Sequence, residues 1–320
     1  MPDRQSAYVL ISPCRNEAPF MRRTLDSVLA QTAPPALWVI VDDGSTDETP
    51  EILDSYAERH SFIRIVRRLD RGRRAVGPGV IEAFYAGLQT VDLEDFEYLC
   101  KLDLDIDLPP GYFEHLIEQM CADARLGTCS GMPYFVNSAG QPVSERCGPE
   151  VSVGMTKFYR RACFQDIGGF VPQVMWDAID CHTARMRGWR AIALDDPALA
   201  FEHLRPMGSS EKGVLNGRRR HGFGQYFMGS DPAYFAATAL YRTTRPPYLI
   251  GGLAMIQGYV AAWARGEARY PDPEFRAFLR RFQRRVLRVG KKRAVAEVEA
   301  EREGIRPSTL HPSAADPATT

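Results

Sequence analysis

Short apolar runs alternate with segments of helical periodicity along the N-terminal part of the chain. In the first such segment, apolar residues recur every three to four positions, at Phe20, Met21, Leu25, Val28 and Leu29. The predicted strands cover residues 8–11, 37–41, 62–66 and 96–102, and the predicted helices cover 19–31, a segment beginning at 50, 80–88 and 110–121. This order of strands and helices predicts an α/β domain with a mostly parallel sheet flanked by helices.

A polar cluster follows three of the predicted strands. The clusters comprise residues 14–17, 42–47 and 103–107. In an open α/β sheet, ligands bind beyond the carboxyl ends of the strands. We therefore expect the three clusters to meet at one edge of the sheet and to form a ligand site there.

The third cluster lies in the segment KLDLDIDLPP, which places Asp103, Asp105 and Asp107 at alternating positions. Alternate side chains of a strand share one face, and clustered carboxylates repel one another unless a cation neutralises them. Mg²⁺ and Mn²⁺ suit carboxylate oxygens, and Mg²⁺ keeps coordination positions for phosphate oxygens. The pattern indicates a phosphate-bearing substrate held through a metal, although an isolated D-x-D sequence is more often a solvated strand end.

The alternation becomes less regular after residue 126. Further strands are expected at 126–131, 151–159 and 191–194, with a helix over 177–187. Aromatic residues, Gly and Pro become more frequent after residue 218, and the last residues are rich in Pro, Ser, Thr and Ala. We expect an α/β domain over 1–215, a helical appendage over 216–293 and a disordered tail over 294–320.

The helical appendage contains an uncharged stretch, residues 248–264, between Arg245 and Arg265. A membrane-spanning helix needs about 20 apolar residues, so this stretch is marginal as a span. Residues 275–289 then show an apolar face at helical spacing, surrounded by arginine and lysine. A basic amphipathic helix beside an apolar segment predicts peripheral membrane contact through 245–293. The alternative is that both segments pack against their own domain.

Composition and charge exclude several classes of protein. The chain has 40 Lys plus Arg and 40 Asp plus Glu, so it lacks the net positive charge that would favour binding to nucleic acid. Its seven cysteines have no metal-like spacing, which indicates reduced thiols. The apolar run near the N-terminus is too short for a signal peptide. We expect a cytoplasmic protein that lies at the inner face of the cell membrane.

Four segments share a family pattern: ISPCRNE, VIVDDGSTDETPEIL, KLDLDIDLPPGYFE, and IGGF followed by WDAID. Together they resemble glycosyltransferase family 2, over about residues 8–203. The resemblance implies the GT-A nucleotide-sugar-binding fold and inverting sugar transfer from a UDP- or GDP-sugar with Mg²⁺ or Mn²⁺. It implies donor contacts from Pro13, Arg15, Glu17, Asp42, Asp43, Lys101 and Asp103, and Arg71 is a further candidate for contact with the donor. The chain departs from the family around Arg71, where many members have an Asn-x-Gly turn, but a guanidinium suits a diphosphate.

The resemblance also assigns Asp103 and Asp105 to the metal, with His203 as a third ligand. In inverting transfer a carboxylate takes the proton of the acceptor hydroxyl. The family's acidic motif is replaced here by WDAID, so Asp177 and Asp180 are both candidates, and spacing favours Asp177. The two lie on one helix face, where each can raise the pKa of the other. Asp177 can equally serve only as a helix N-cap.

Membrane contact suits a glycan or lipid-linked acceptor in cell-surface polysaccharide assembly. Two other classes fit part of the pattern. A nucleotidyltransferase that makes an activated sugar would carry a Gly-rich phosphate turn near the N-terminus, which ISPCRNE lacks. A non-catalytic, membrane-associated sugar-nucleotide-binding protein would not need the carboxylates Asp103, Asp105, Asp177 and Asp180.

Overall fold

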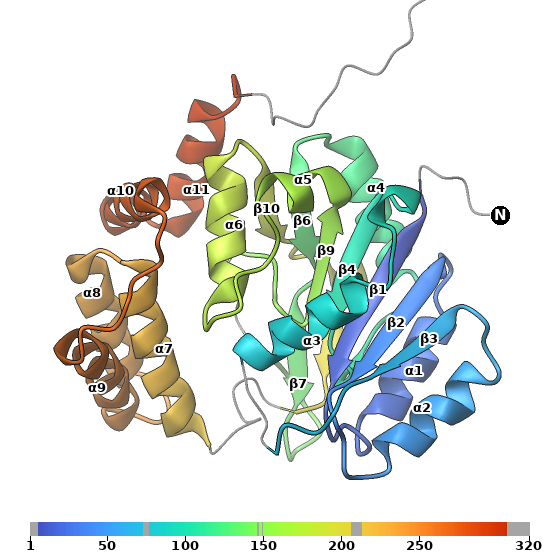
Figure 1. Cartoon of the computed structure of the whole chain (residues 1–320). Coiled ribbons are helices and arrows are strands. Elements are labelled where there is room, and N and C mark those ends of the chain that lie inside the picture. Colours follow the sequence, from blue (N-terminus) through green and yellow to red (C-terminus); the bar gives the residue numbers. More distant parts are fainter. Residues whose placement is uncertain (1–5, 73–76, 146, 149, 206–212, 306–320) are drawn as a thin grey trace, which may run out of the picture.

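The computed structural model describes residues 6–72, 77–145, 147–148, 150–205 and 213–305. Its centre is a seven-stranded sheet in the order β10-β6-β9-β4-β1-β2-β3 (Figure 1). The strands are β1 (Tyr8–Cys14), β2 (Leu37–Asp42), β3 (Ile63–Arg67), β4 (Tyr98–Leu102), β6 (Leu126–Ser130), β9 (Thr156–Arg160) and β10 (Arg190–Ala193). Neighbouring strands are parallel except that β9 is antiparallel to β4 and β6. The predicted mostly parallel α/β domain is confirmed.

Helices cover both faces of this sheet. One face carries α1 (Met21–Leu29), α2 (Thr49–Ala57) and α4 (Tyr112–Ala122), and the other carries α3 (Pro78–Leu88), α5 (Arg161–Asp166) and α6 (Trp176–Met186). Successive side chains of a strand point to opposite faces, so β1 supplies Tyr8 and Leu10 to one core and Val9 and Ile11 to the other. Strands buried on both sides explain why the sequence shows continuous apolar runs rather than alternation.

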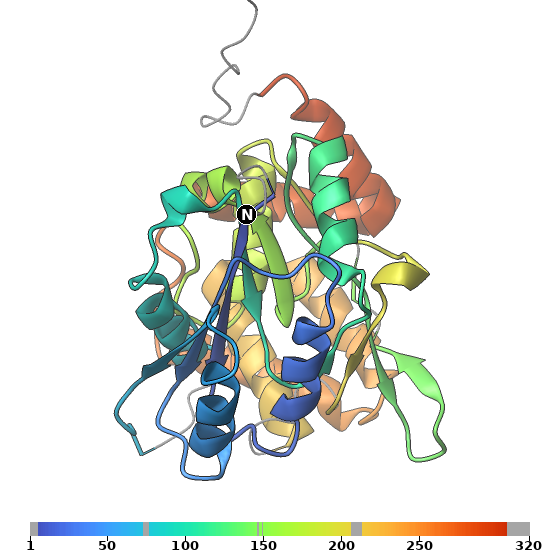
Figure 2. The same cartoon turned by 90° about the vertical axis from the view of Figure 1, so that its right-hand side faces the viewer.

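A second, four-stranded sheet in the order β5-β11-β7-β8 borders the carboxyl edge. It consists of β5 (Ile106–Asp107), β11 (Phe201–His203), β7 (Pro133–Val136) and β8 (Pro142–Ser144), and Figure 2 shows the β7–β8 hairpin projecting beside the main sheet. Two 3₁₀ helices, η1 (Leu93–Asp95) and η2 (Pro197–Leu199), complete this part. Because β11 pairs with β5, His203 lies directly opposite Ile106 and next to the aspartates.

The strand expected over 151–159 begins only at Thr156. The backbone before it bonds to side chains and to a loop instead of a neighbouring strand: Val153 N donates to Ser130 Oγ at 2.9 Å, and Met155 O accepts from Asp103 N at 2.7 Å. This irregular segment brings Gly154 next to the candidate site.

Five helices pack beside α6 at one end of the sheet (Figure 1). They are α7 (Val214–Met228), α8 (Pro232–Thr243), α9 (Ile250–Ala264), α10 (Pro273–Val289) and α11 (Lys291–Glu301). A third apolar core joins α6 to α10 and α11, and it buries Phe275, Phe278, Leu279 and Phe282 of α10. The apolar face of residues 275–289 therefore packs inside the protein, so membrane contact through that face is wrong.

Two of these helices begin with the same local signal. Asp272 accepts hydrogen bonds from the backbone N of Glu274 and Phe275, and Pro273 occupies the first helical position of α10. Asp231 and Pro232 do the same for α8. The aspartate satisfies otherwise unpaired N–H groups, and proline has the backbone angle that a first turn needs.

The domain limits expected from the sequence change in two places. The limit between 215 and 216 falls inside α7, and residues 294–301, expected to be disordered, belong to α11. Ala294, Val295 and Val298 of α11 are buried in the third core, which explains why this charged segment is ordered. Residues 306–320 lie outside the described residues. No helix in the described ranges has both the length and the apolar composition of a membrane span.

Candidate active site

Hydrogen bonds from backbone to side chains tie the loops after β1 and β2 together. Asn16 N donates to Ser45 Oγ at 3.0 Å, Thr46 N donates to Asn16 Oδ1 at 2.8 Å, and Glu17 N donates to Thr49 Oγ1 at 2.9 Å. Asn16 has a positive φ of 53°, which asparagine tolerates better than most residues. The two loops therefore form one rigid rim at the carboxyl edge of the sheet.

Three arginines surround Asp43 on this rim. Its Oδ1 accepts hydrogen bonds from Arg68 Nη1 and Arg71 Nη2, both at 2.7 Å. Arg15 Nη1 donates to the Asp43 backbone O at 2.6 Å, and Arg15 Nη2 pairs with Asp70 Oδ1 at 2.5 Å. Two guanidinium groups thus meet at the Asp43 carboxylate and a third lies at its backbone carbonyl, a cationic setting that suits a bound diphosphate.

The neighbouring predicted residues hold the rim in shape. Asp42 Oδ1 accepts from Ser45 N at 2.9 Å, which closes the turn after β2. Pro13 lies in β1 beside Val41 of β2. Of the residues predicted to bind donor, Arg15, Asp42, Asp43 and Arg71 therefore lie together, whereas Glu17 turns toward the aspartates.

Asp103 and Asp105 lie in the middle of the edge and face cations of the protein itself. Asp103 pairs with Lys101, whose Nζ also donates to Gly154 O at 2.8 Å. Arg205 bridges Asp105 and Glu17, with Nε 2.5 Å from Asp105 Oδ2 and Nη2 2.8 Å from Glu17 Oε1. The third aspartate, Asp107, lies apart on β5 and pairs with Arg23.

His203 connects the aspartates to a further carboxylate. Its Nε2 lies 3.5 Å from Asp105 Oδ2, and its Nδ1 lies 2.8 Å from Glu145 Oε2. Burial lowers the pKa of His203, but the hydrogen bonds with Asp105 and Glu145 outweigh burial and raise it to about 9. Burial likewise raises the pKa of Asp105, but His203 and Arg205 lower it overall, so Asp105 stays ionised.

The residue types around Asp105 fit a divalent cation. Asp105 Oδ1 is buried and has no hydrogen-bond partner among the described residues, the state of an oxygen that is open to a cation. Asp103 adds carboxylate oxygens and His203 adds an imidazole, ligands that Mn²⁺ accepts. As the side chains now lie, no three His, Cys, Asp or Glu residues in the described ranges form a group that would hold a metal ion.

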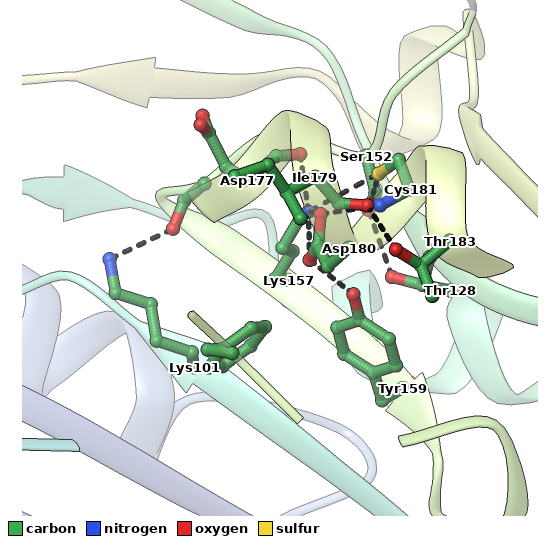
Figure 3. Close-up of polar contacts among 12 residues, drawn as sticks. Lys101, Thr128, Ser152, Lys157, Tyr159, Asp177, Ile179, Asp180, Cys181 and Thr183 are labelled. Atoms are coloured by element: carbon green, nitrogen blue, oxygen red, sulfur yellow. Dashed lines mark hydrogen bonds and ion pairs between the residues drawn. The ribbon is translucent and has the colours of Figure 1, made fainter. Parts of the chain in front are cut away.

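Asp177 lies in the first turn of α6, beside Gly154. A Cβ on Gly154 would lie 3.2 Å from Asp177 Oδ2, so the lack of a side chain there leaves room for this carboxylate. Burial raises the pKa of Asp177, the Lys157 ammonium opposes this rise, and the charge of Asp180 adds to it. Figure 3 shows the Asp177 carboxylate pointing away from Lys157 and Asp180.

Asp180, one turn along α6, is enclosed. Its carboxylate pairs with Lys157 Nζ and accepts a hydrogen bond from Tyr159 Oη. Lys157 Nζ also donates to the Asp177 backbone O at 2.7 Å, and the Lys157 side chain is fully buried (Figure 3). The Lys157–Asp180 pair therefore holds the start of α6 against β9.

Asp177 lines a cavity of about 500 Å³ between α6 and the helical appendage. The lining includes Gly77, Phe135, Glu145, Val174, Met175, Trp176, Val214, Gly217, Arg218, Arg220, His221 and Arg242. Lys101 connects Asp103 to the segment beside Asp177, because its Nζ contacts both Asp103 and the backbone O of Gly154, which lies next to Asp177. A molecule in the cavity would contact Asp177.

The sequence profile described as "Glycosyl transferase family 2" matches residues 9–176, slightly more than half of the chain. The chain belongs to glycosyl transferase family 2. The family match ends at Trp176, so Asp177, His203, Arg205 and the appendage lie beyond it.

Among known members of this family, the chain is similar to a poly-beta-1,6-N-acetyl-D-glucosamine synthase of Staphylococcus epidermidis. The two are 29% identical over 127 residues, which is 39% of this chain and 28% of the synthase. The corresponding synthase of Staphylococcus aureus is 27% identical over 138 residues, 43% of this chain and 31% of the synthase. The chain thus matches less than a third of the length of these curated relatives.

Two solved structures share the fold of this family 2 chain. The mannosyltransferase PcManGT from Pyrobaculum calidifontis, in complex with GDP-Man and Mn²⁺, has a TM-score of 0.51 at 20% identity and covers 95% of this chain and 89% of its own. GalNAc-T7 with UDP, GalNAc and Mn²⁺ has a TM-score of 0.53 at 15% identity and covers 85% and 56%. The GT-A fold expected from the sequence is confirmed.

Several polar residues of this family 2 site carry no local sequence signal. Glu145, Lys157 and Arg205 reach the site from other elements, and Arg205 bonds to a residue 188 positions away. The sequence offered one hint for Arg205, its position two residues after His203 at the end of a short apolar run.

Proposed function

We propose that the protein transfers a sugar, with inversion, from a UDP- or GDP-sugar to an acceptor hydroxyl. The donor lies along the rim formed by Arg15, Asp42, Asp43 and Arg71. PcManGT and GalNAc-T7, which share the fold, were crystallised with GDP-Man and UDP, and both complexes contain Mn²⁺. The guanidinium groups around Asp43 supply the charge that a leaving diphosphate needs.

A divalent cation belongs to this proposal. Asp105 and Asp103 would hold Mg²⁺ or Mn²⁺ together with His203, and the bound cation would neutralise part of the diphosphate charge. Glu145 supports this role because it orients His203 from the other ring nitrogen, as carboxylates commonly do for metal-binding histidines.

Asp177 is the proposed base, and its position carries the proposal. The carboxylate lines the cavity, points away from the Lys157–Asp180 pair, and has a raised pKa suited to accepting a proton. The acceptor oxygen attacks the anomeric carbon, its proton passes to Asp177, and the C–O bond to the diphosphate breaks with its electron pair going to the departing phosphate. Asp180 is a positioning residue, because both its oxygens are engaged inside the protein.

The proposed acceptor is a lipid-linked glycan, in cell-surface polysaccharide assembly, reached from a membrane surface. This part rests on α9, whose faces are reversed relative to an ordinary surface helix. Its inner side carries Gly251, Gly252, Ala254 and Ala262, and its exposed side carries the stripe Leu249, Leu253, Ile256, Val260 and Trp263. An apolar stripe at helical spacing, flanked by the exposed Arg245 and Arg265, suits a bilayer with anionic headgroups.

Donor hydrolysis tests the enzymatic part of the proposal. The full chain with Mn²⁺ should slowly release UDP or GDP from the matching sugar nucleotide, and EDTA should abolish this release. Asp105→Asn should reduce it strongly, whereas Asp107→Asn, a surface residue paired with Arg23, should leave it unchanged. Pyrophosphate release from a nucleoside triphosphate, or hydrolysis insensitive to EDTA, would contradict the proposal.

A further inference from the structure

Two arginines of the helical appendage line the cavity beside Asp177 without an acidic partner. Arg218 comes from α7 and Arg242 from α8, and both are half-buried. Neither side chain forms an ion pair with any described residue, and Arg242 Nε is buried with no hydrogen-bond partner in those ranges. Burial and the charge of Arg242 both lower the pKa of Arg218, so the two guanidinium groups repel each other.

The other charges around the cavity do not offset these two. The acids of the described lining are Glu145 and Asp177. Glu145 is already paired with His203, which leaves Asp177 as the acid of the described lining that can offset a cation. His221 contributes little charge, because burial together with Arg242 and Arg218 lowers its pKa to about 4. Among the described residues, Arg218 and Arg242 have no ion-pair partner and share the lining with one such acid, Asp177, so these three groups leave a net positive charge in a half-buried space.

Unpaired cations of this kind destabilise the folded chain unless an anion from outside joins them. Guanidinium groups bind phosphate oxygens through paired hydrogen bonds, and two guanidinium groups from different helices can share one phosphoryl group. Elsewhere on its surface α8 exposes Leu240 and Tyr241, and α9, which packs against α8, exposes the apolar stripe. The surroundings thus combine an anion site with an apolar surface outside it.

We propose that the cavity binds a phosphoryl group of the acceptor, held by Arg218 and Arg242 in the cavity that Asp177 also lines. This inference rests on the transferase function proposed above and specifies its acceptor as a phosphate ester. The ester's apolar part would lie along α8 and α9, while its reacting oxygen faces Asp177.

Binding of simple phosphates to the full chain tests the inference. Decyl phosphate should bind the wild type, and Arg218→Gln and Arg242→Gln should each weaken its affinity about tenfold, the effect expected for one charge-assisted hydrogen bond. The uncharged decyl β-glucoside should bind the variants and the wild type alike. Arg218→Lys should recover part of the affinity. The matched control is Arg219→Gln, an exposed arginine of α7 next to Arg218 whose Nε donates to Gln257 Oε1 and which does not line the cavity.

Inorganic phosphate distinguishes two sources of the anion. Much weaker binding than that of decyl phosphate supports a lipid phosphate, and equal binding supports a soluble phosphate ester. The double variant should keep or raise its Tm, since it removes two repelling charges, so a loss of affinity would not reflect unfolding. Unchanged decyl phosphate binding in a folded double variant, or no phosphate binding by the wild type, overturns the inference. Donor hydrolysis in the same preparation reports on the transferase function separately.

Discussion

Asp177 and Asp180 lie one helical turn apart on α6 and are in opposite environments. Asp177 faces a cavity, and burial raises its pKa. Asp180 is enclosed by Lys157 and Tyr159. A raised carboxyl pKa means that the folded state holds the proton more tightly than the unfolded state, so the ionised Asp177 lowers stability at neutral pH. Asp180 instead forms a buried ion pair, and removing only one of its two partners would lower the free energy of unfolding strongly.

Replacing Asp177 should separate activity from stability. Asp177→Asn should lower kcat by about 10²- to 10⁴-fold, the usual range for loss of a general base. Its Tm should stay the same or rise, because the substitution removes a carboxylate whose ionisation is unfavourable in the fold. Initial rates and thermal unfolding measure the two effects. Asp54→Asn, a surface carboxylate paired with Arg67, is the control for loss of an acid. Full activity in folded Asp177→Asn would exclude it as the base.

The pH dependence of kcat/KM should report the ionisation of Asp177. Asp177 must be ionised to accept a proton, so kcat/KM should fall as the pH is lowered through its pKa. Because that pKa is raised, the acid limb should have its midpoint above the ordinary aspartate value of about 4. The residual activity of Asp177→Asn should lack this limb. A midpoint at or below the ordinary value would contradict the burial of this carboxylate.

Asp180 should affect stability more than chemistry. Asp180→Asn leaves the Lys157 ammonium buried without its carboxylate and should reduce the free energy of unfolding by about 3–5 kcal/mol. Replacing both partners, Lys157→Met with Asp180→Leu, should restore much of the stability, because apolar side chains of similar size need no counter-charge. Chemical denaturation measures the difference. If Asp180→Asn is as stable as the parent yet inactive, Asp180 is the base instead.

The sequence could identify those site residues that lie close together along the chain, directly after a predicted strand. Asp42 and Asp43 follow a strand, and Asp103 and Asp105 alternate after another, so backbone geometry alone brings them to the same edge. Arg205, Arg218 and Arg242 could not be identified in this way. Each approaches the site through packing of elements far apart in the chain, and arginines on helices are ordinarily solvated.

At the scale of elements, α7 and α9 approach closely through glycines. A Cβ on Gly222 of α7 would lie 1.9 Å from Met255 O, and one on Gly258 of α9 would lie 2.0 Å from Arg219 O. The backbones of the two helices are therefore in direct contact at these points. This close pairing supports α7, which carries Arg218, and turns the large apolar side chains of α9 outward.

A methyl group at this contact should disrupt the pair. Gly258→Ala forces α9 away from α7 and should reduce the free energy of unfolding by about 1–3 kcal/mol, the range for overpacking. Gly251→Ala is a matched control on the same helix, because its Cβ would meet Pro247 at an ordinary 3.5 Å. That control should be neutral or stabilising by up to about 1 kcal/mol, since alanine favours helix. Equal Tm values for the two variants would contradict the close contact.

The sequence predicted these helices but not their orientation. Residues 275–289 have the stronger amphipathic pattern and face inward on α6, whereas residues 248–264 are uncharged all round and expose large apolar side chains. An apolar face predicts that a helix packs against another apolar surface, but it does not identify that surface. Only the glycines and alanines of α9 indicate which of its sides approaches another helix, and their partners lie on α7 and α8.

For the whole molecule, the apolar stripe of α9 and the cavity beside Asp177 belong to one appendage. α9 packs against α7 and α8, the helices that supply Arg218 and Arg242 to the cavity. A bilayer against the stripe would therefore bring membrane-anchored acceptors to the open side of Asp177. Deleting residues 218–293 would not be a clean test of membrane contact, because the deletion would also expose Ile179 and Met186 of α6, which this segment buries.

Point substitutions on the stripe provide the test. The wild type should sediment with vesicles rich in phosphatidylglycerol, and Leu253→Glu with Trp263→Glu should abolish sedimentation, because these side chains are 60% and 64% exposed on one face of α9. Arg245 and Arg265 should make the binding salt-sensitive, at about 1 kcal/mol per arginine near an anionic surface.

Leu287→Glu is the control, because Leu287 is also exposed, at 45%, but lies on α10 away from the stripe. If the α9 double variant sediments like the parent, or the parent stays in the supernatant at low salt, the stripe does not face a bilayer. Donor hydrolysis should persist in the double variant, since neither side chain reaches the rim, so a loss confined to sedimentation separates membrane contact from catalysis.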